Sequence, residues 1–268
     1  MAIVQAIILG IIEGLTEFLP VSSTGHLIVA ERAIGYKDTA EIFAVVIQVG
    51  AIAAILWFYR HDLMNKVTGL FGGDRPVRRF WANWVIASSP ALVAGLALEK
   101  YLDKLATPSI IAVALIVGGI AIILVENYHR SAPTKPSPQF SSLSIRQSFQ
   151  VGCYQILALI PGVSRSGATI MGGLLSGLDR VTATAFSFYL SIPIIVLASG
   201  YKLLKGRDDF DTVAGGGLAM LVGAVTAFVV AFFVVGWLLR YVSKHDFKPF
   251  AYYRIGLGIV IFAALALF

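Results

Sequence analysis

The chain has 268 residues, of which 57% are hydrophobic and only 13% are charged. Soluble domains average about 25% charged residues, so this composition excludes an ordinary soluble protein and predicts an all-α polytopic membrane protein in a lipid bilayer. The net charge of +6 does not indicate nucleic-acid binding, because the basic residues lie in short loops between apolar segments. The single cysteine excludes an intramolecular disulfide.

Ten helical segments are predicted, in two sets of five. The first set covers residues 2–18, 24–34, 39–60, 80–99 and 108–128. The second set covers residues 145–160, 166–177, 180–204, 212–240 and 249–267. The second segment of each set is too short to cross a bilayer, which takes about 20 residues. Each of these short segments follows a turn that contains proline, so it is predicted to form a re-entrant hairpin with the helix before it.

The two sets begin with copies of one segment. The stretch GIIEGLTEFLPVSSTGH, from Gly10 to His26, aligns without a gap on a stretch that starts at Gly152, 142 residues later, and opens GCYQILALIPGVSRSGA. Three predicted spans separate the two hairpins, and an odd number inserts the second copy upside down. We therefore expect a single membrane domain with about six full spans. It consists of repeat 1 (about 1–130), repeat 2 (about 145–268) and a polar loop (131–144) between them.

The charges of the loops predict the orientation. Ten lysines and arginines fall in the loops 60–80, 128–145 and 240–248, while the other face carries seven that are interspersed with acids. The positive-inside rule makes the first of these faces cytoplasmic. The first hairpin, and the site it carries, is then expected to open to the outer face.

Glu13 and Glu17 stand four residues apart, so they share one face of the first helix. An ionised side chain at the centre of a bilayer costs about 2.5–3.5 kcal/mol, so two acids there need a compensating cation. We expect a divalent cation, Mg²⁺ or Ca²⁺, because both prefer carboxylate, phosphate and water oxygens. An acid/base pair, a buried ion pair and two acids that simply face a loop are the alternatives.

Hydroxyl groups crowd both turns. In the first turn the candidate phosphate-binding residues and their neighbours are Ser22, Ser23, Thr24, Gly25 and His26. In the second they are Ser164, Arg165, Ser166, Gly167 and Thr169. A helix N-terminus binds anions, so these residues are predicted to hold phosphate, with the glycines allowing close approach of the backbone.

Four of the turn residues can carry chemistry. Ser22 or Ser23 is predicted to be a nucleophile with His26 as its general base. Arg165 is predicted to grip phosphate and to stabilise charge in the transition state, an ion pair with Glu13 or Glu17 being the alternative.

Two amides are expected to support the site. Gln48 lies in an apolar span, where hydrogen bonding between helices is an equal alternative. Gln155 aligns with Glu13 in the repeat.

Both turns resemble signatures of the bacterial undecaprenyl-pyrophosphate phosphatases of the bacitracin-resistance type. The first signature is EGLTEFLPVSSTGH, which starts at Glu13, and the second is PGVSRSGAT, which starts at Pro161. The resemblance covers essentially the whole chain. It implies that undecaprenyl pyrophosphate is hydrolysed to undecaprenyl phosphate and inorganic phosphate, which recycles the lipid carrier for peptidoglycan synthesis and confers resistance to bacitracin.

The same resemblance implies a multi-pass protein of the bacterial inner (plasma) membrane, a divalent cation and a polyprenyl pyrophosphate substrate. It also implies catalytic roles for Glu17, Ser23, His26 and Arg165, with assistance from Glu13. Formation of a homodimer is left open.

Two other readings compete with this one. Type 2 phosphatidic-acid phosphatases share a Gly-His pair and a Ser-Arg segment, but at the place of their nucleophilic histidine this chain has Met171. That difference favours attack by a serine or by activated water. A polyprenyl-phosphate transporter or flippase would suit an inverted repeat, but the ionisable residues concentrate in the two hairpins, which favours an enzyme.

Overall fold

The computed structural model describes residues 2–36, 41–130, 140 and 143–267, and within them the only regular secondary structure is helical. The first half contains α1 (Ala2–Thr16), α2 (Ser23–Ile34), α3 (Ile42–Phe58), α4 (Arg60–Phe71), α5 (Arg75–Leu102), η1 (Asp103–Leu105) and α6 (Pro108–Arg130). The second contains α7 (Ile145–Ile156), η3 (Leu157–Leu159), α8 (Arg165–Leu175), α9 (Arg180–Lys205), η4 (Arg207–Thr212), α10 (Gly216–Val242) and α11 (Lys248–Leu267). The predicted all-α class is confirmed.

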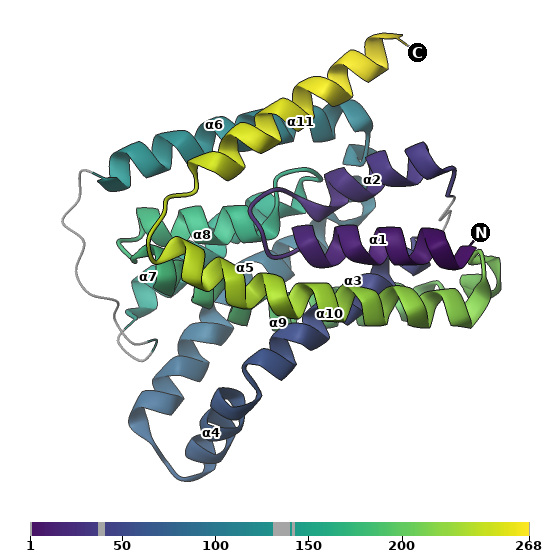
Figure 1. The fold of residues 1–268 in the computed structure, drawn as a ribbon. Coiled ribbons are helices and arrows are strands. Elements are labelled where there is room, and N and C mark those ends of the chain that lie inside the picture. Colours follow the sequence, from purple (N-terminus) through teal and green to yellow (C-terminus); the bar gives the residue numbers. More distant parts are fainter. Residues whose placement is uncertain (1, 37–40, 131–139, 141–142, 268) are drawn as a thin grey trace.

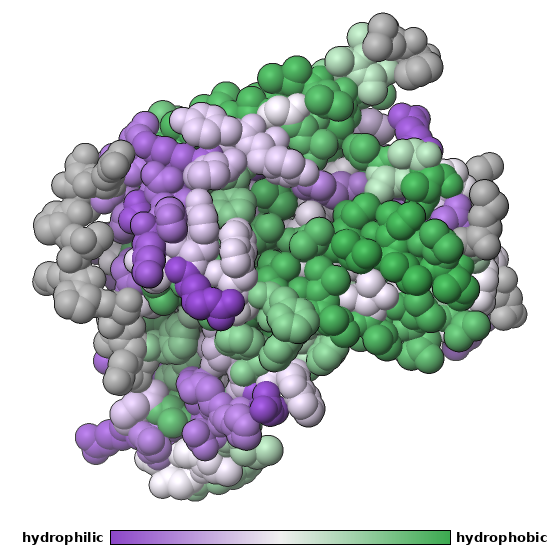
Figure 2. Space-filling view, in the orientation of Figure 1, coloured by the Kyte–Doolittle hydropathy of each residue, from purple (hydrophilic) through white to green (hydrophobic). Residues whose placement is uncertain are grey.

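Five helices of the described chain are long and apolar enough to cross a membrane, namely α5, α6, α9, α10 and α11. The pair α3–α4 passes the same test as one unit, bent by 69°, and brings the number of candidate spans to six if the pair is one broken span rather than a re-entrant loop. The protein is therefore a multi-pass membrane protein. Figure 2 shows a broad apolar surface over α1 and α10, with polar residues gathered at the left and lower ends of the molecule.

The two predicted hairpins are α1–α2 and α7–α8, whose helices have 15, 12, 12 and 11 residues. None of the four could cross a bilayer alone. Their turns share an unusual backbone: φ is 72° at Ser22 and 75° at Ser164, in a region that favours glycine. Such a conformation costs about 1–3 kcal/mol and is retained only where the surroundings enforce it. These two serines are aligned in the repeat, so both turns share one strained geometry.

The two halves of the chain interlock. In Figure 1 α1 (dark purple) runs beside α10 (yellow-green), while α7 packs on α5, α3 on α9 and α6 on α11. The aligned glycines of the repeat allow two of these contacts. A Cβ at Gly10 would lie 2.6 Å from the carbonyl oxygen of Gly223, and one at Gly152 would lie 2.5 Å from that of Ala87. Each hairpin thus packs on a span of the other half, as expected for an inverted repeat.

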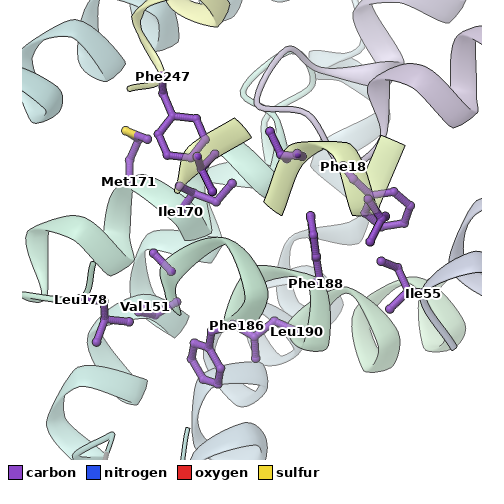
Figure 3. Close-up of a cluster of buried hydrophobic side chains, with 14 of the residues drawn as sticks. Phe18, Ile55, Val151, Ile170, Met171, Leu178, Phe186, Phe188, Leu190 and Phe247 are labelled. Carbon is purple, nitrogen blue, oxygen red and sulfur yellow. The ribbon is translucent and has the colours of Figure 1, made fainter. Parts of the chain in front are cut away.

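A buried apolar cluster lies beneath the two turns (Figure 3). Phe18 from the first turn meets Phe188 of α9 edge to face, with ring centroids 5.6 Å apart. Ile170 and Met171 of α8 and Phe247 from the α10–α11 turn belong to the same cluster. This packing anchors both turns to the long spans, which fixes where their polar residues can lie.

The prediction of a loop over residues 60–80 was wrong, because α4 and the first turns of α5 occupy it. One face of α4 is apolar, and most of that face is exposed. Its members are Leu63, Met64, Val67, Leu70 and Phe71. The 212–240 segment also begins later than predicted, at Gly216. Most of the predicted loop 131–144 lies outside the described residues, as do residues 39 and 40 of the predicted 39–60 segment.

Candidate active site

The tips of the two hairpins are in direct contact. The Ser166 hydroxyl at the start of α8 donates a hydrogen bond to the carbonyl oxygen of Leu19 in the first turn, at 2.7 Å. One residue earlier, the Arg165 guanidinium reaches the Glu17 carboxylate, with 3.4 Å between Nη2 and Oε1. The sequence predicted that acids of one turn would lie beside the cation of the other, and this contact is found for Glu17. A single site is therefore built from both halves.

The Glu17 carboxylate is the centre of this site. Its Oε2 accepts a hydrogen bond of 2.6 Å from the Ser23 hydroxyl, while Oε1 faces Arg165. The Glu17 and Arg165 side chains are only 6% and 11% exposed. A buried carboxylate is stable only when it is paired and hydrogen-bonded, and here both oxygens have a partner. The carboxylate is well placed to take a proton from Ser23 because it already accepts its hydrogen bond.

Arg165 is held from a second side by α9. Its Nη1 donates to the Ser187 carbonyl oxygen at 2.9 Å, and the Ser187 hydroxyl lies 2.6 Å from that of Thr169. The buried Nε of Arg165 has no hydrogen-bond partner among the described residues. This unpaired donor leaves the guanidinium able to bind one more acceptor, such as a phosphate oxygen.

Among the described residues the hydrogen bonds of His26 go to partners other than Ser23, its predicted nucleophile. Its Nδ1 lies 2.7 Å from the Ser22 carbonyl oxygen, and its Nε2 lies 2.7 Å from the Tyr253 hydroxyl. A carbonyl oxygen only accepts, so Nδ1 carries the proton, and in neutral imidazole the Tyr253 hydroxyl donates to Nε2. The two rings are also stacked, with centroids 5.5 Å apart. The Ser23 hydroxyl therefore donates its hydrogen bond to Glu17 rather than to His26.

The remaining hydroxyls and glycines of the turns have mainly local partners. The Ser164 hydroxyl caps α8 by accepting from the Gly167 N–H at 3.1 Å, whereas Ser22 makes no such bond at the start of α2. Thr24 is exposed. A Cβ at Gly25 would lie 3.4 Å from Ile111 and Leu115 of α6, which is an ordinary van der Waals contact, so helix packing does not require a glycine there. The close approach of a ligand to Gly25 stays a prediction.

The two supporting amides lie apart from this centre. Gln155 is buried, and its Nε2 is 3.4 Å from the Ala87 carbonyl oxygen on α5. Gln48 makes no side-chain hydrogen bond with any described residue. Neither amide contacts Glu17, Ser23, His26 or Arg165 through a hydrogen bond in the described part of the chain.

Glu13 is the candidate for holding a cation together with Glu17. The described residues contain no cluster of three or more histidines, cysteines, aspartates and glutamates of the kind that holds a metal alone. Glu13 is nevertheless buried, and its Oε1 has no hydrogen-bond partner among the described residues. A hard cation such as Mg²⁺ takes one or two carboxylates and fills its remaining positions with water and phosphate oxygens. The two glutamates fit that kind of site.

Sequence reasoning missed three residues at the site. Ser187 holds Arg165 and Tyr253 holds His26, and neither lies near a turn in the sequence. Arg254 is buried and donates to both turns, through Pro20 and Gly162. One signal could have found it, because an arginine inside a predicted span is a candidate functional residue by default.

Comparison with known proteins identifies the family of the chain. A family model described as bacitracin resistance protein BacA matches residues 6–260. The chain belongs to the BacA family. A relative from Methylobacillus flagellatus named undecaprenyl-diphosphatase is 47% identical over 266 residues, which is 97% of each chain. Relatives in Clostridium tetani (undecaprenyl-diphosphatase) and Burkholderia lata (undecaprenyl-diphosphatase 1) are 46% and 50% identical. Both alignments cover 97% of this chain, and they cover 95% and 94% of the two relatives, respectively.

The residues matched by the family model include the whole site. The BacA family match includes both turns and all of α1 to α10 except the first residues of α1. Both acids, Ser23, His26, Arg165 and the three residues missed from the sequence lie within it. The family assignment therefore concerns the whole site rather than one hairpin.

Proposed function

We propose that this protein is an undecaprenyl-diphosphatase, which hydrolyses undecaprenyl pyrophosphate to undecaprenyl phosphate and inorganic phosphate. The observation that carries the proposal is the Glu17 carboxylate, held between the Ser23 hydroxyl and the Arg165 guanidinium where the hairpins meet. An acid, a hydroxyl and a cation at this spacing suit phosphoryl transfer, which depends mainly on positioning and on neutralisation of charge. Membership of a family whose curated relatives carry that name supports the same activity.

In the first step Ser23 attacks the terminal phosphorus. Its proton passes to Glu17 along the existing 2.6 Å hydrogen bond, a bond forms between the serine oxygen and phosphorus, and the bond to the lipid phosphate oxygen breaks. The leaving group is undecaprenyl phosphate. Water then attacks the phosphoserine, which releases inorganic phosphate and restores the hydroxyl. Arg165 and the N-terminus of α8 stabilise the negative charge in both steps.

The remaining residues orient this chemistry. The Ser22 carbonyl and the Tyr253 hydroxyl hold His26 in one tautomer. These two hydrogen bonds attach the start of α2, which carries Ser23, to α11. Glu13 and Glu17 would hold a divalent cation, Mg²⁺ or Ca²⁺. When bound, such a cation supplies charge neutralisation to the phosphate oxygens. The buried, unpaired Oε1 of Glu13 supports this assignment.

We further infer that the protein resides in the bacterial inner membrane, with the site open to the periplasmic face. The excess of basic residues in the segments 60–80, 128–145 and 240–248, ten against seven in the segments assigned to the other face, supports this orientation. Recycling of the carrier lipid for peptidoglycan synthesis and resistance to bacitracin then follow from the activity.

Release of phosphate from undecaprenyl pyrophosphate by the purified protein in detergent tests the activity. We expect turnover by the unchanged protein and loss of turnover in Arg165→Ala. Arg207→Ala is the matched control, because the Arg207 side chain is 78% exposed. No phosphate release by the unchanged protein, or equal turnover in Arg165→Ala, would contradict the proposal. Lipid transport without phosphate release would point to the rival transporter class.

A rapid-quench experiment tests the phosphoserine. Substrate labelled in its terminal phosphate should leave label on Ser23 in the unchanged protein and none in Ser23→Ala. Label in the product alone, with an unlabelled protein at every time point, would favour direct attack by water that Glu17 activates.

A further inference from the structure

Arg254 is the largest fully buried side chain in the described part of the chain. It lies on α11, inside a candidate span, and is 1% exposed. Its guanidinium donates to five carbonyl oxygens. These are Leu115 from Nε at 3.2 Å, Pro20 from Nη1 at 3.2 Å, and Ala114, Gly162 and Val163 from Nη2 at 3.1, 3.0 and 3.0 Å. Arg254 thus joins four parts of the chain, namely α11, α6 and both hairpin turns.

Two of these acceptors are equivalent in the repeat. Pro20 and Gly162 are 142 residues apart (162 − 20 = 142), and each lies two residues before the strained serine of its turn. The fifth long segment of the first half, α6, has no lysine or arginine before its last residue, Arg130, so it offers no equivalent of Arg254. One guanidinium therefore serves both copies of the turn, from only one half of the chain.

The surrounding helices leave room for this side chain. A Cβ at Gly118 of α6 would lie 2.2 Å from Nη2, and a Cβ at Gly167 of α8 would lie 3.2 Å from Nη1. Either substitution would crowd the guanidinium. Gly167, which the sequence suggested as a point of ligand approach, thus has a structural reason to lack a side chain. Three helices, α6, α8 and α11, therefore determine where the Arg254 side chain lies.

The partners of Arg254 explain what it does. No carboxylate forms an ion pair with it among the described residues, and all five acceptors are backbone carbonyls. A buried cation is costly unless its donors are all satisfied. Satisfying them here requires both turns to keep their carbonyls aimed at one point. Displacement of either turn would leave a buried donor without a partner, so Arg254 resists such displacement.

We propose that Arg254 is a positioning residue that clamps the two hairpin turns together and so sets the separation of Ser23, Glu17 and Arg165. The proposal rests on the proposed function for its kinetic consequence, but the clamp itself can be measured without catalysis. A planar guanidinium can hold two turns at once, whereas the lysine ammonium is a single point donor on a flexible stem. Misplacement of reacting groups by 1 Å costs roughly 100-fold in rate.

The kinetic test uses two substitutions and a matched control. In Arg254→Lys we expect kcat for phosphate release to fall by about 100-fold while KM changes little, because the substrate-binding groups remain. Gly118→Ala keeps Arg254 but crowds its Nη2, and should lower kcat in the same direction. Gly256→Ala is the control, since Gly256 lies on the same helix with nothing within 4 Å of an added Cβ. Its kcat should be unchanged.

The structural test is hydrogen exchange of the purified protein in detergent. Arg254→Lys and Gly118→Ala should both speed exchange in peptides that cover residues 17–23 and 160–167, while Gly256→Ala should leave them as in the unchanged protein. Normal exchange in these peptides for both substitutions would overturn the clamp, as would an unchanged kcat. If Arg254→Lys fails to fold, Gly118→Ala decides. If the unchanged protein releases no phosphate, the proposed function fails but the exchange measurement still tests the clamp.

Discussion

Replacement of Glu17 by glutamine tests the centre of the site with almost no change in shape. The amide oxygen of Glu17→Gln can still accept a hydrogen bond from Ser23, but it cannot take the proton, and it no longer carries a charge that balances Arg165. Loss of a general base lowers the rate by about 10²- to 10⁴-fold. At 1.36 kcal/mol for each factor of ten, this corresponds to about 3–5 kcal/mol of lost transition-state stabilisation.

A second consequence concerns stability. The pair that Glu17 forms with Arg165 is buried, with side chains 6% and 11% exposed. Removing one partner of such a pair costs about 3–5 kcal/mol, because the other charge stays buried without compensation. The bond from Arg165 to the Ser187 carbonyl remains and offsets part of this loss. We therefore expect a lower thermal unfolding midpoint in detergent together with the loss of turnover.

The control is an exposed glutamate in an ion pair. Glu41 pairs with Lys202, and their side chains are 59% and 49% exposed. An exposed pair contributes about 0–1 kcal/mol, so Glu41→Gln should change neither phosphate release nor the unfolding midpoint appreciably. Turnover of Glu17→Gln within threefold of the unchanged protein, measured at saturating substrate, would refute the assignment of Glu17 as the base.

The other predictions concern packing, backbone strain, metal dependence and orientation. In Gly50→Ala the added Cβ would lie 2.2 Å from the Ala224 carbonyl oxygen. The thermal unfolding midpoint in detergent should therefore fall, by an amount that corresponds to about 1–3 kcal/mol of stability. An unchanged midpoint would contradict the packing of α3 on α10. Ser22→Gly should relieve the strain at φ 72° and raise that midpoint by the equivalent of about 1 kcal/mol, whereas Ser22→Ala should not. Chelation by EDTA should stop phosphate release and added Mg²⁺ or Ca²⁺ should restore it, while full activity in EDTA would exclude the cation. A cysteine at Ala33→Cys, in a Cys153→Ser background, should react with a membrane-impermeant label from outside the cell, and labelling only after lysis would reverse the orientation.

The sequence was most informative where the two halves align. The repeat and the odd number of spans between its copies predicted that Glu17 and Arg165, 148 residues apart, would meet, and they lie 3.4 Å apart. The partner of His26 could not be predicted in this way. Tyr253 stands 227 residues away and outside any motif, so only the packed helices bring its hydroxyl to the imidazole.

The error at α4 has a different physical cause. Hydropathy suggested a loop because charged residues recur along the segment, yet Asp62 bonds the Tyr189 hydroxyl and Lys66 lies over the rings of Phe80 and Tyr189. The charges therefore face the protein, while most of the apolar face of the helix is exposed. A single sequence shows the period of such a helix but not which face the rest of the chain covers.

The interlocked halves also constrain how the protein is made. α1, which carries Glu13, packs on α10. A ribosome that adds about 5–20 residues per second completes α10 about 10–45 s after α1. During that interval the acidic helix is without its partner helix, and its carboxyl groups are without Arg165 for most of the time. The first hairpin must therefore remain at the membrane surface or bound to the insertion machinery. It can pack in its final position only after the chain is nearly complete. Truncation anywhere before α10 should for this reason leave a product for the quality-control proteases rather than a half-enzyme.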